Sequence, residues 1–234
     1  MILFDCGQTL IVEPQFDRDA ANRALLRHAS PLPAGYTESD FCTYATDLYR
    51  SLTDPLHSQY REMSHTAFLR LLFDSLGMTL DVPYEQADLL YWDTATHDSF
   101  ATPGAAECLA KLQKSGIRIG IISNMCYARS SLQARLARYL PGIEFELLIV
   151  SSDYVVRKPD PRIFTVACRK AALDPQEVWY VGDNPNADVV GAAAVGIHPV
   201  LYTGAHMRSY DRLPDVPFDR IDSLAALTAL LETA

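Results

Sequence analysis

The sequence contains no apolar run that approaches the ~20 residues needed to cross a bilayer. Its first residues, Met1-Ile2-Leu3-Phe4-Asp5, also lack the basic start and the long apolar segment of a secretion signal. We therefore expect a cytoplasmic protein that has no membrane-bound part.

Basic residues and paired cysteines are also scarce. The chain has 20 Lys and Arg against 29 Asp and Glu, which gives a formal net charge of −9 and argues against nucleic acid as a partner. The five cysteines are scattered, with no CxxC pair and no His cluster at zinc spacing. We expect free thiols in a reducing compartment.

The remaining composition is that of a folded globular protein. Of the 234 residues, 49% are hydrophobic and 21% are charged, close to the average for globular domains. This length suits one enlarged domain or one domain that carries an inserted unit.

Short apolar runs alternate with helix-compatible stretches along most of the chain. The runs are Met1–Phe4, Ile117–Ile122, Phe145–Val150, Val178–Val181 and His198–Tyr202. The stretches after the first run are Ala105–Ser115, Tyr127–Leu140, Pro161–Leu173 and Ala187–Val195. This alternation predicts βαβ units, and hence an α/β fold with a doubly wound, mainly parallel sheet.

One long segment interrupts that alternation. It is rich in helix-compatible stretches, namely Asp17–His28, Ser39–Leu52, His65–Leu76 and Tyr84–Asp98, with turns expected at Pro31, Pro33, Asp54-Pro55, Gly77 and Pro83. We therefore predict a helical insertion over residues 14–99, within a core formed by residues 1–13 and 100–234.

Polar residues follow the apolar runs in a coherent set. They are Asp5 and Thr9, then Ser123 and Asn124, then Ser151, Ser152 and Lys158, then Asp183 and Asp188. Each residue alone suits an ordinary turn or helix cap. Together, at the carboxyl ends of parallel strands, where such sheets bind ligands, they suit an anion held with a divalent cation such as Mg²⁺.

The same residues form four ordered motifs: Asp5-Cys6-Gly7-Gln8-Thr9-Leu10, Ile121-Ile122-Ser123-Asn124, Lys158-Pro159, and Gly182-Asp183-Asn184-Pro185-Asn186-Ala187-Asp188. This order resembles the haloacid dehalogenase-like (HAD) hydrolase superfamily over the whole chain. The resemblance implies a Rossmann-like core, and it identifies residues 14–99 as the helical cap of the first cap class.

The resemblance also implies a phosphatase mechanism for a small phosphorylated molecule. Its catalytic residues are Asp5, as the nucleophile that forms an aspartyl-phosphate, with Ser123 and Lys158 on the phosphoryl oxygens. Its Mg²⁺ residues are Asp5, the Gly7 carbonyl, Asp183 and Asp188, the last orienting metal-bound water or Lys158. Its substrate-side residues are Asn124 and Thr9, with Thr9 also expected to stabilise the loop.

One position departs from the family pattern. The phosphatases of this family usually carry a second Asp two residues after the nucleophile, as general acid and base, and here that residue is Gly7. Such proton transfer contributes ~10²–10⁴ in rate. A cap side chain is one substitute, and the candidates include His28, His57, His65 and His97 with the acidic residues of the segment. Alternatively, Gly7 is present because the turn needs a positive φ.

Two other features near the motifs have structural interpretations. The aromatic residues of Tyr84–Trp92 and Phe100 suit the packing of the cap, with the lining of a pocket as the alternative. Cys6 is expected to point into the sheet interior, opposite to Asp5, because side chains alternate along a strand.

Three functions remain open. The first is a Mg²⁺-dependent phosphomonoesterase of a small metabolite or cofactor. The second is a metal-independent dehalogenase, in which Asp5 attacks carbon, and the third is a catalytically weak phosphate-binding or regulatory relative. The pair Asp183 and Asp188 favours phosphate chemistry, because a metal-free enzyme has little need for both carboxylates.

Overall fold

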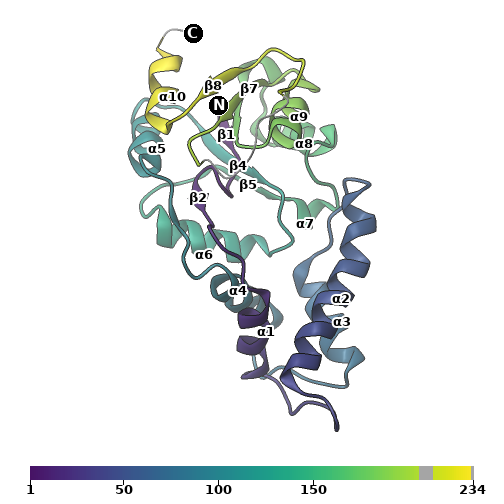
Figure 1. The fold of residues 1–234 in the computed structure, drawn as a ribbon. Coiled ribbons are helices and arrows are strands. Elements are labelled where there is room, and N and C mark those ends of the chain that lie inside the picture. The colour runs from purple at the N-terminus through teal and green to yellow at the C-terminus, as the bar shows by residue number, and fades with distance from the viewer. Residues whose placement is uncertain (206–212, 233–234) are drawn as a thin grey trace.

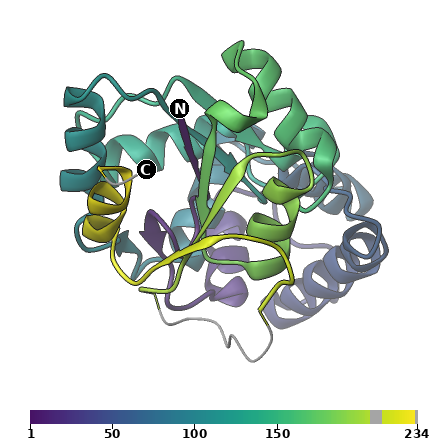
Figure 2. The same cartoon turned by 90° about the horizontal axis from the view of Figure 1, so that it is seen from above.

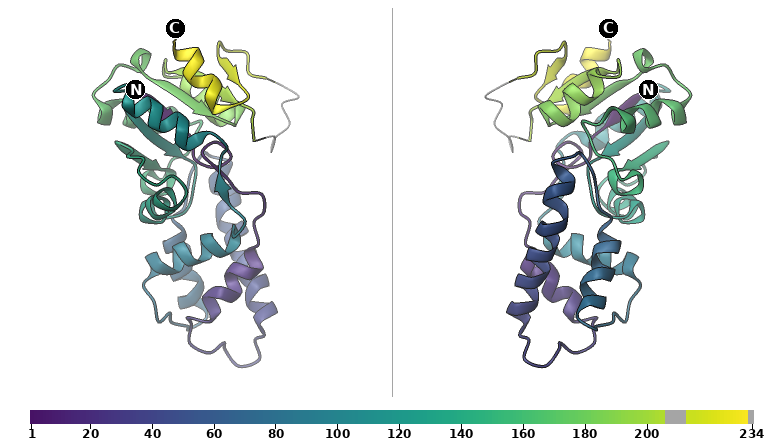
Figure 3. Two further views of the ribbon diagram at one scale, coloured as in Figure 1. Left: turned by 90° about the vertical axis from the view of Figure 1, so that its left-hand side faces the viewer. Right: turned by 90° about the vertical axis from the view of Figure 1, so that its right-hand side faces the viewer.

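The computed structural model describes residues 1–205 and 213–232, so the predicted core segment 100–234 includes residues that lie outside this description. Figures 1 and 3 show two parts, a sheet with its flanking helices and a separate group of helices to one side of it. We call them the sheet lobe and the helical lobe. No helix of the described residues is both long and apolar enough to span a bilayer.

The sheet lobe is built on six parallel strands, as the alternating runs predict. The strands are β1 (Ile2–Phe4), β4 (Ile119–Ser123), β5 (Leu147–Val150), β6 (Trp179–Gly182), β7 (His198–Tyr202) and β8 (Asp219–Ile221). Their order is β5-β4-β1-β6-β7-β8, so the chain adds β4 and β5 on one side of β1 and then returns to add β6, β7 and β8 on the other side. Ligands bind at this kind of switch point in an open α/β sheet.

Both faces of the sheet are covered, which confirms the doubly wound α/β fold. Ile2 and Phe4 pack on one side, and Leu3, between them, packs on the other. The first face is covered by α5 (Ala105–Lys114), α6 (Arg129–Tyr139) and α10 (Leu224–Leu231), and the second by α8 (Pro161–Ala171) and α9 (Gly191–Ala193). Figure 2 shows these two layers on either side of the strands.

Several short elements are absent from the sequence prediction. They are β8, α10 (Leu224–Leu231), the one-turn helix α7 (Ser151–Tyr154) and the 3-10 helix η1 (Pro175–Glu177). The expected helix Ala187–Val195 is present, but its first part is the π-helix η2 (Pro185–Val190). Elements of three to eight residues show too few repeats of an apolar period to stand out.

The helical lobe contains the four helices expected in the inserted segment. They are α1 (Arg18–Leu26), α2 (Glu38–His57), α3 (His65–Ser75) and α4 (Tyr84–Ala95). The expected turn at Asp54-Pro55 is wrong, because α2 continues to His57. A proline this close to the helix end removes only one hydrogen bond, and Ser58 Oγ donates to the Pro55 carbonyl at 2.8 Å.

A short antiparallel ribbon joins the lobes. It consists of β2 (Ile11–Val12) and β3 (Phe100–Ala101), with Ile11 opposite Ala101 and Val12 opposite Phe100. Strands of two residues are too short to show an alternation of apolar and polar residues, and the sequence analysis therefore did not predict them. The division into residues 1–13 with 100–234 and residues 14–99 falls at the end of this ribbon, and it stays a prediction.

Candidate active site

A cavity of about 370 Å³ lies where the carboxyl ends of the central strands meet the helical lobe. Asp5 follows β1, which puts it in the middle of the sheet edge, and Ser123 ends the neighbouring strand β4. Most residues proposed from the sequence border this cavity: Asp5, Gly7, Ser123, Asn124, Lys158, Asp183 and Asp188. The strand-end argument therefore located one site from four distant segments.

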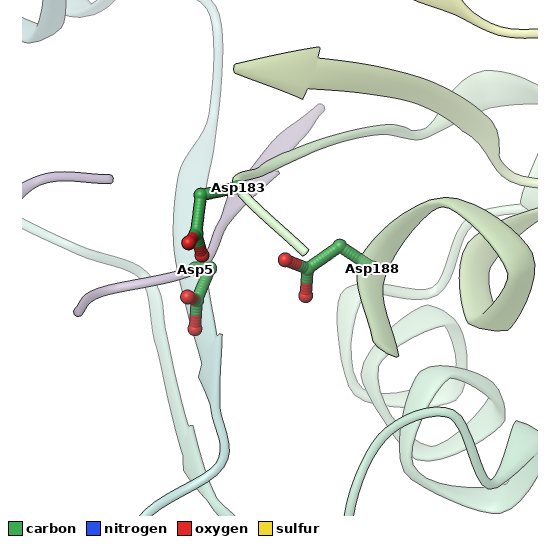
Figure 4. A group of neighbouring side chains, drawn as sticks. All are labelled: Asp5, Asp183 and Asp188. Carbon is green, nitrogen blue, oxygen red and sulfur yellow. The ribbon is translucent and has the colours of Figure 1, made fainter. Parts of the chain in front are cut away.

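Three buried carboxylates converge at this edge of the sheet. Asp5, Asp183 and Asp188 each offer an oxygen, and these oxygens lie within 4.8 Å of one another (Figure 4). Carboxylate oxygens are the hard donors that Mg²⁺ takes in proteins. The chemistry of the donor set, three carboxylates beside one lysine ammonium group that bonds to two of them, fits a divalent cation.

That ammonium group belongs to Lys158. Its Nζ donates to Asp5 Oδ1 at 2.8 Å, to Asp188 Oδ1 at 2.7 Å and to the Tyr180 hydroxyl at 2.7 Å. Burial opposes charge on the amine, but the carboxylates of Asp188 and Asp5 outweigh it and raise the pKa of Lys158. Lys158 is therefore a fixed positive charge beside Asp5, with all three donors in use.

Tyr180 is a site residue that the sequence did not single out. It lies inside β6, and its hydroxyl donates to the Ile122 carbonyl at 2.7 Å while accepting from Lys158. Burial raises the pKa of Tyr180 well above its ordinary value, so the hydroxyl stays protonated. One signal was available in the sequence: Tyr180 lies in a predicted buried strand, and a buried tyrosine hydroxyl usually has a hydrogen-bond partner.

Asp5 itself lies in a low-dielectric environment. Burial raises the pKa of its carboxyl, and the neighbouring Lys158 opposes that rise. The next residue, Cys6, belongs to the apolar cluster that includes Phe4 and Leu10, as expected from alternation. Burial raises the pKa of the Cys6 thiol, and the sulfur therefore remains an unreactive thiol.

Asp188 is positioned by its neighbours on both oxygens. Oδ1 accepts from Lys158, and Oδ2 accepts from the Asn184 backbone N–H at 2.8 Å, at the start of η2. A Cβ built on Gly182 would lie 2.3 Å from Asp188 Oδ2, so the carboxylate occupies the space that a side chain at 182 would take. Gly182 is therefore required by close approach.

Ser123 and Asn124 follow the second strand as expected. Ser123 is almost fully buried and borders the cavity. The Asn124 amide accepts from the Lys158 backbone N–H at 2.7 Å and donates to the Lys158 carbonyl at 2.9 Å. The oxygen and the nitrogen of this amide therefore both bind the Lys158 backbone, which connects the loop after β4 to the loop that carries Lys158.

The structure of the loop after Asp5 tests two expectations from the sequence, a positive φ at Gly7 and a substrate-side position for Thr9. The alternative that Gly7 needs a positive φ is wrong, because the positive φ, 61°, belongs to Gln8, and a Cβ on Gly7 would meet nothing within 4 Å. Thr9 is fully buried and does not line the cavity. Its hydroxyl is therefore placed inside the loop, away from the proposed substrate side.

The helical lobe supplies the opposite wall, which includes Phe16, Arg18, Tyr49, His57, Glu62 and Trp92. Among the four candidate histidines, His57 borders this cavity, whereas His65 is buried against Asp88, His28 pairs with Asp81 at the surface, and His97 is exposed. Trp92 is an aromatic residue that lines the pocket, whereas Phe100 is exposed on β3.

The two lobes meet at a buried arginine that the sequence also did not reveal. Arg135 on α6 donates to Glu13 Oε1 at 2.9 Å, to Ser99 Oγ at 3.0 Å and to Asp93 Oδ1 at 2.8 Å. Trp92 Nε1 donates to the same Glu13 oxygen at 2.8 Å. Glu13 and Ser99 lie on the two segments that connect the lobes, and Asp93 lies on α4. Arg135 therefore binds both connecting segments and α4 to the sheet lobe.

Comparison with known proteins identifies the family of this chain. The sequence matches the family described as haloacid dehalogenase-like hydrolase over residues 1–196. A glyceraldehyde 3-phosphate phosphatase of Methanopyrus kandleri is 26% identical over 225 residues, which cover 94% of this chain and 92% of that protein.

Solved structures share the fold. The HAD phosphatase from Thermococcus onnurineus superposes with a TM-score of 0.64 at 22% identity, covering 98% of this chain and 96% of the other. A 2-haloacid dehalogenase from Pseudomonas syringae pv. Tomato DC3000 superposes with a TM-score of 0.62 at 21% identity, covering 99% and 97%. The fold is thus common to proteins of both names, and the residues of the site must distinguish the two chemistries.

Proposed function

Because the chain belongs to the haloacid dehalogenase-like hydrolase family, we propose that it is one of the family's phosphatases and that it hydrolyses a small phosphate monoester with Mg²⁺ through an aspartyl-phosphate. The relative from Methanopyrus kandleri, a phosphatase named for a three-carbon phosphate, supports a small substrate. A cavity of about 370 Å³ also suits a metabolite rather than a polymer.

The observation that carries this proposal is the cluster of Asp5, Asp183 and Asp188, two of which, Asp5 and Asp188, pair with Lys158. A metal-free attack on carbon needs one carboxylate nucleophile, and it gains nothing from two further buried anions. Phosphoryl transfer needs a nucleophile and concentrated positive charge, which a cation at this donor set together with Lys158 would provide.

In the proposed reaction Asp5 acts twice. One Asp5 oxygen attacks phosphorus, the bond from phosphorus to the leaving oxygen breaks, and its electron pair goes to that oxygen. Water then attacks the phosphorus of the aspartyl-phosphate, and the electron pair of the broken bond returns to Asp5. Asp5, the Gly7 carbonyl and Asp183 are proposed to hold Mg²⁺, which would offset the repulsion between carboxylate and phosphoryl oxygens.

The other motif residues have supporting roles in this scheme. Ser123 donates a hydrogen bond to a phosphoryl oxygen, and Lys158 provides the fixed charge beside Asp5. Asp188 orients Lys158, because its Oδ1 is one of the three acceptors of that amine. Asn124 positions the Lys158 loop through two backbone hydrogen bonds, and residues 14–99 serve as the cap over the substrate.

The test is hydrolysis of 4-nitrophenyl phosphate with and without Mg²⁺. We expect Mg²⁺-stimulated turnover that Asp5→Asn abolishes, while Asp74→Asn, a change on the exposed side of α3, leaves it intact. A variant Asp5→Asn with near-normal turnover would remove Asp5 from the mechanism. A protein that binds inorganic phosphate without cleaving the ester would instead support the weak phosphate-binding relative.

A dehalogenase is the second candidate, favoured by Gly7, since this position is not Asp in that branch either. This function predicts release of halide from a 2-haloacid in the presence of a chelator, with Asp5 attacking carbon. Chelator-resistant halide release without phosphatase activity would replace the first proposal.

A further inference from the structure

The helical lobe places an imidazole at the cavity where the chain lacks a proton carrier. Position 7 has no side chain, and His57, the last residue of α2, borders the same cavity as Asp5 and Ser123. His28, His65 and His97 do not border it. The structure therefore reduces the four histidines considered from the sequence to one.

A buried carboxylate orients this imidazole. His57 Nε2 lies 3.1 Å from Oε1 of Glu62, whose side chain is only 2% exposed. Because a carboxylate can only accept, the Nε2 position carries the hydrogen of this bond. No described residue forms a hydrogen bond with the other nitrogen, Nδ1. A carboxylate that fixes one ring nitrogen leaves the other to exchange protons with a ligand.

Side-chain contacts tie Glu62 to the loop that carries Ser123. Glu62 Oε2 accepts from Ser151 Oγ at 3.0 Å, and the same hydroxyl accepts from the Met125 backbone N–H at 2.9 Å. Met125 directly follows the Ser123-Asn124 motif. The pair of His57 and Glu62 is therefore fixed to one of the loops proposed to bind the phosphoryl group.

Backbone contacts tie the same pair to the loop that carries Lys158. The Glu62 N–H donates to the Val155 carbonyl at 3.1 Å, and the Arg157 N–H donates to the Tyr60 carbonyl at 3.0 Å, around an antiparallel bridge between Arg61 and Val156. Lys158 is the next residue along the chain.

The bridge is flanked by unfavourable backbone. Tyr60 has φ = 55° and the β-branched Val155 has φ = 60°, a conformation that such residues seldom adopt. Strain of this kind persists where the surrounding structure enforces it, and it is frequent at functional sites. It supports a functional reason for holding Glu62 against the Lys158 loop.

We propose that His57, oriented by Glu62, is the proton donor and acceptor that replaces the carboxylate absent at Gly7, an inference that rests on the proposed phosphatase function. As Asp5 attacks phosphorus, Nδ1–H of the imidazolium gives its proton to the leaving oxygen, directly or through one water. Neutral Nδ1 then takes a proton from the water that attacks the aspartyl-phosphate, which restores the imidazolium.

The test compares two leaving groups in single-turnover and steady-state kinetics. Glycerol 3-phosphate leaves as an alkoxide that needs a proton, whereas 4-nitrophenyl phosphate leaves as a stable anion. For His57→Asn we expect a fall of ~10²-fold or more with glycerol 3-phosphate. With the aryl ester the first turnover keeps its rate and the steady state slows, giving a burst of 4-nitrophenolate.

The chain offers a matched control in His28, which also lies 3.1 Å from a carboxylate, that of Asp81, but outside the cavity. We expect His28→Asn to behave as the unchanged protein with both esters. Adding Gly7→Asp to His57→Asn should restore cleavage of glycerol 3-phosphate, because a Cβ at position 7 meets no atom within 4 Å and the backbone there has no positive φ.

Three results would overturn the inference. An equal loss of first-turnover rate with both esters in His57→Asn would indicate a structural role. An unchanged protein that cleaves the aryl ester but not glycerol 3-phosphate would show that no proton is delivered, while the proposed function stands. An unchanged protein that cleaves neither ester with Mg²⁺ would refute the proposed function and, with it, this role for His57.

Discussion

The guanidinium carbon of Arg135 lies 4.3 Å from the centre of the Trp92 ring, with the Arg135 side chain completely buried. This stacking joins a helix of the sheet lobe to a helix of the helical lobe. The guanidinium is also paired with Glu13 and Asp93, so its charge is compensated within the protein.

We expect Arg135→Ala to lower the free energy of unfolding by about 3–5 kcal/mol, because it removes the buried cation that pairs with both Glu13 and Asp93. Arg138→Ala is the matched control, since Arg138 pairs with the same Asp93 carboxylate at 2.8 Å while half exposed. Its loss should cost about 1 kcal/mol or less. Urea unfolding of both variants measures the difference, and equal losses would contradict the inter-lobe role of Arg135.

Gly182→Ala should damage the site although it adds only one methyl group. The new Cβ would overlap the Asp188 carboxylate and displace it from Lys158. We expect loss of 4-nitrophenyl phosphate turnover together with a lower melting temperature. Gly7→Ala is the control for stability, because the same atom meets nothing within 4 Å there, and similar melting temperatures for the two variants would count against this prediction.

Removing the Asp183 carboxylate should weaken metal binding in the absence of any substrate. We expect titration calorimetry with Mg²⁺ to show at least a tenfold weaker Kd for Asp183→Ala, equivalent to about 1.4 kcal/mol or more. Asp19→Ala, at an exposed carboxylate of α1, should bind as the unchanged protein does. Unaltered Mg²⁺ affinity in Asp183→Ala would exclude Asp183 from the proposed ligands.

Tyr180→Phe should destabilise the Lys158 site while preserving the packing of the ring against Phe164. The change removes one acceptor of Lys158 and the donor to the Ile122 carbonyl. We expect a loss of about 1–3 kcal/mol in stability and slower turnover. Tyr154→Phe, whose hydroxyl forms no hydrogen bond with any described residue, provides the comparison, and equal behaviour of the two variants would show that the Tyr180 hydroxyl is dispensable.

The sequence predicted the parts of the site that follow strands. Asp5, Ser123 and Asp183 could be placed together because parallel strands bring their carboxyl ends to one edge. The same rule explains the doubly wound fold, in which β7 matches its predicted run and β1, β4, β5 and β6 differ from theirs by one or two residues at one or both ends.

The contacts that cross between lobes were not readable in the same way. Glu62 meets Ser151 across 89 residues, and Arg135 meets Asp93 across 42 residues, with no local pattern that pairs them. Tyr180 was not predicted as a site residue because it lies within an apolar strand. Thr9 was placed on the substrate side because a motif gives the position of a residue but not the direction of its side chain. Contacts of these kinds depend on tertiary packing, between the lobes for Glu62 and Arg135 and within the sheet lobe for Tyr180, which periodicity does not encode.

The bridge between residues 60–62 and 155–157 makes two amide hydrogens sensors of lobe separation. The helical lobe is joined to the sheet lobe covalently through β2 and β3, whereas the N–H groups of Glu62 and Arg157 are bonded across the boundary by hydrogen bonds alone. A movement that separates residues 60–62 from residues 155–157 would release these two hydrogens to solvent. The rate of deuterium uptake at these two amides therefore measures how often the two walls of the cavity separate.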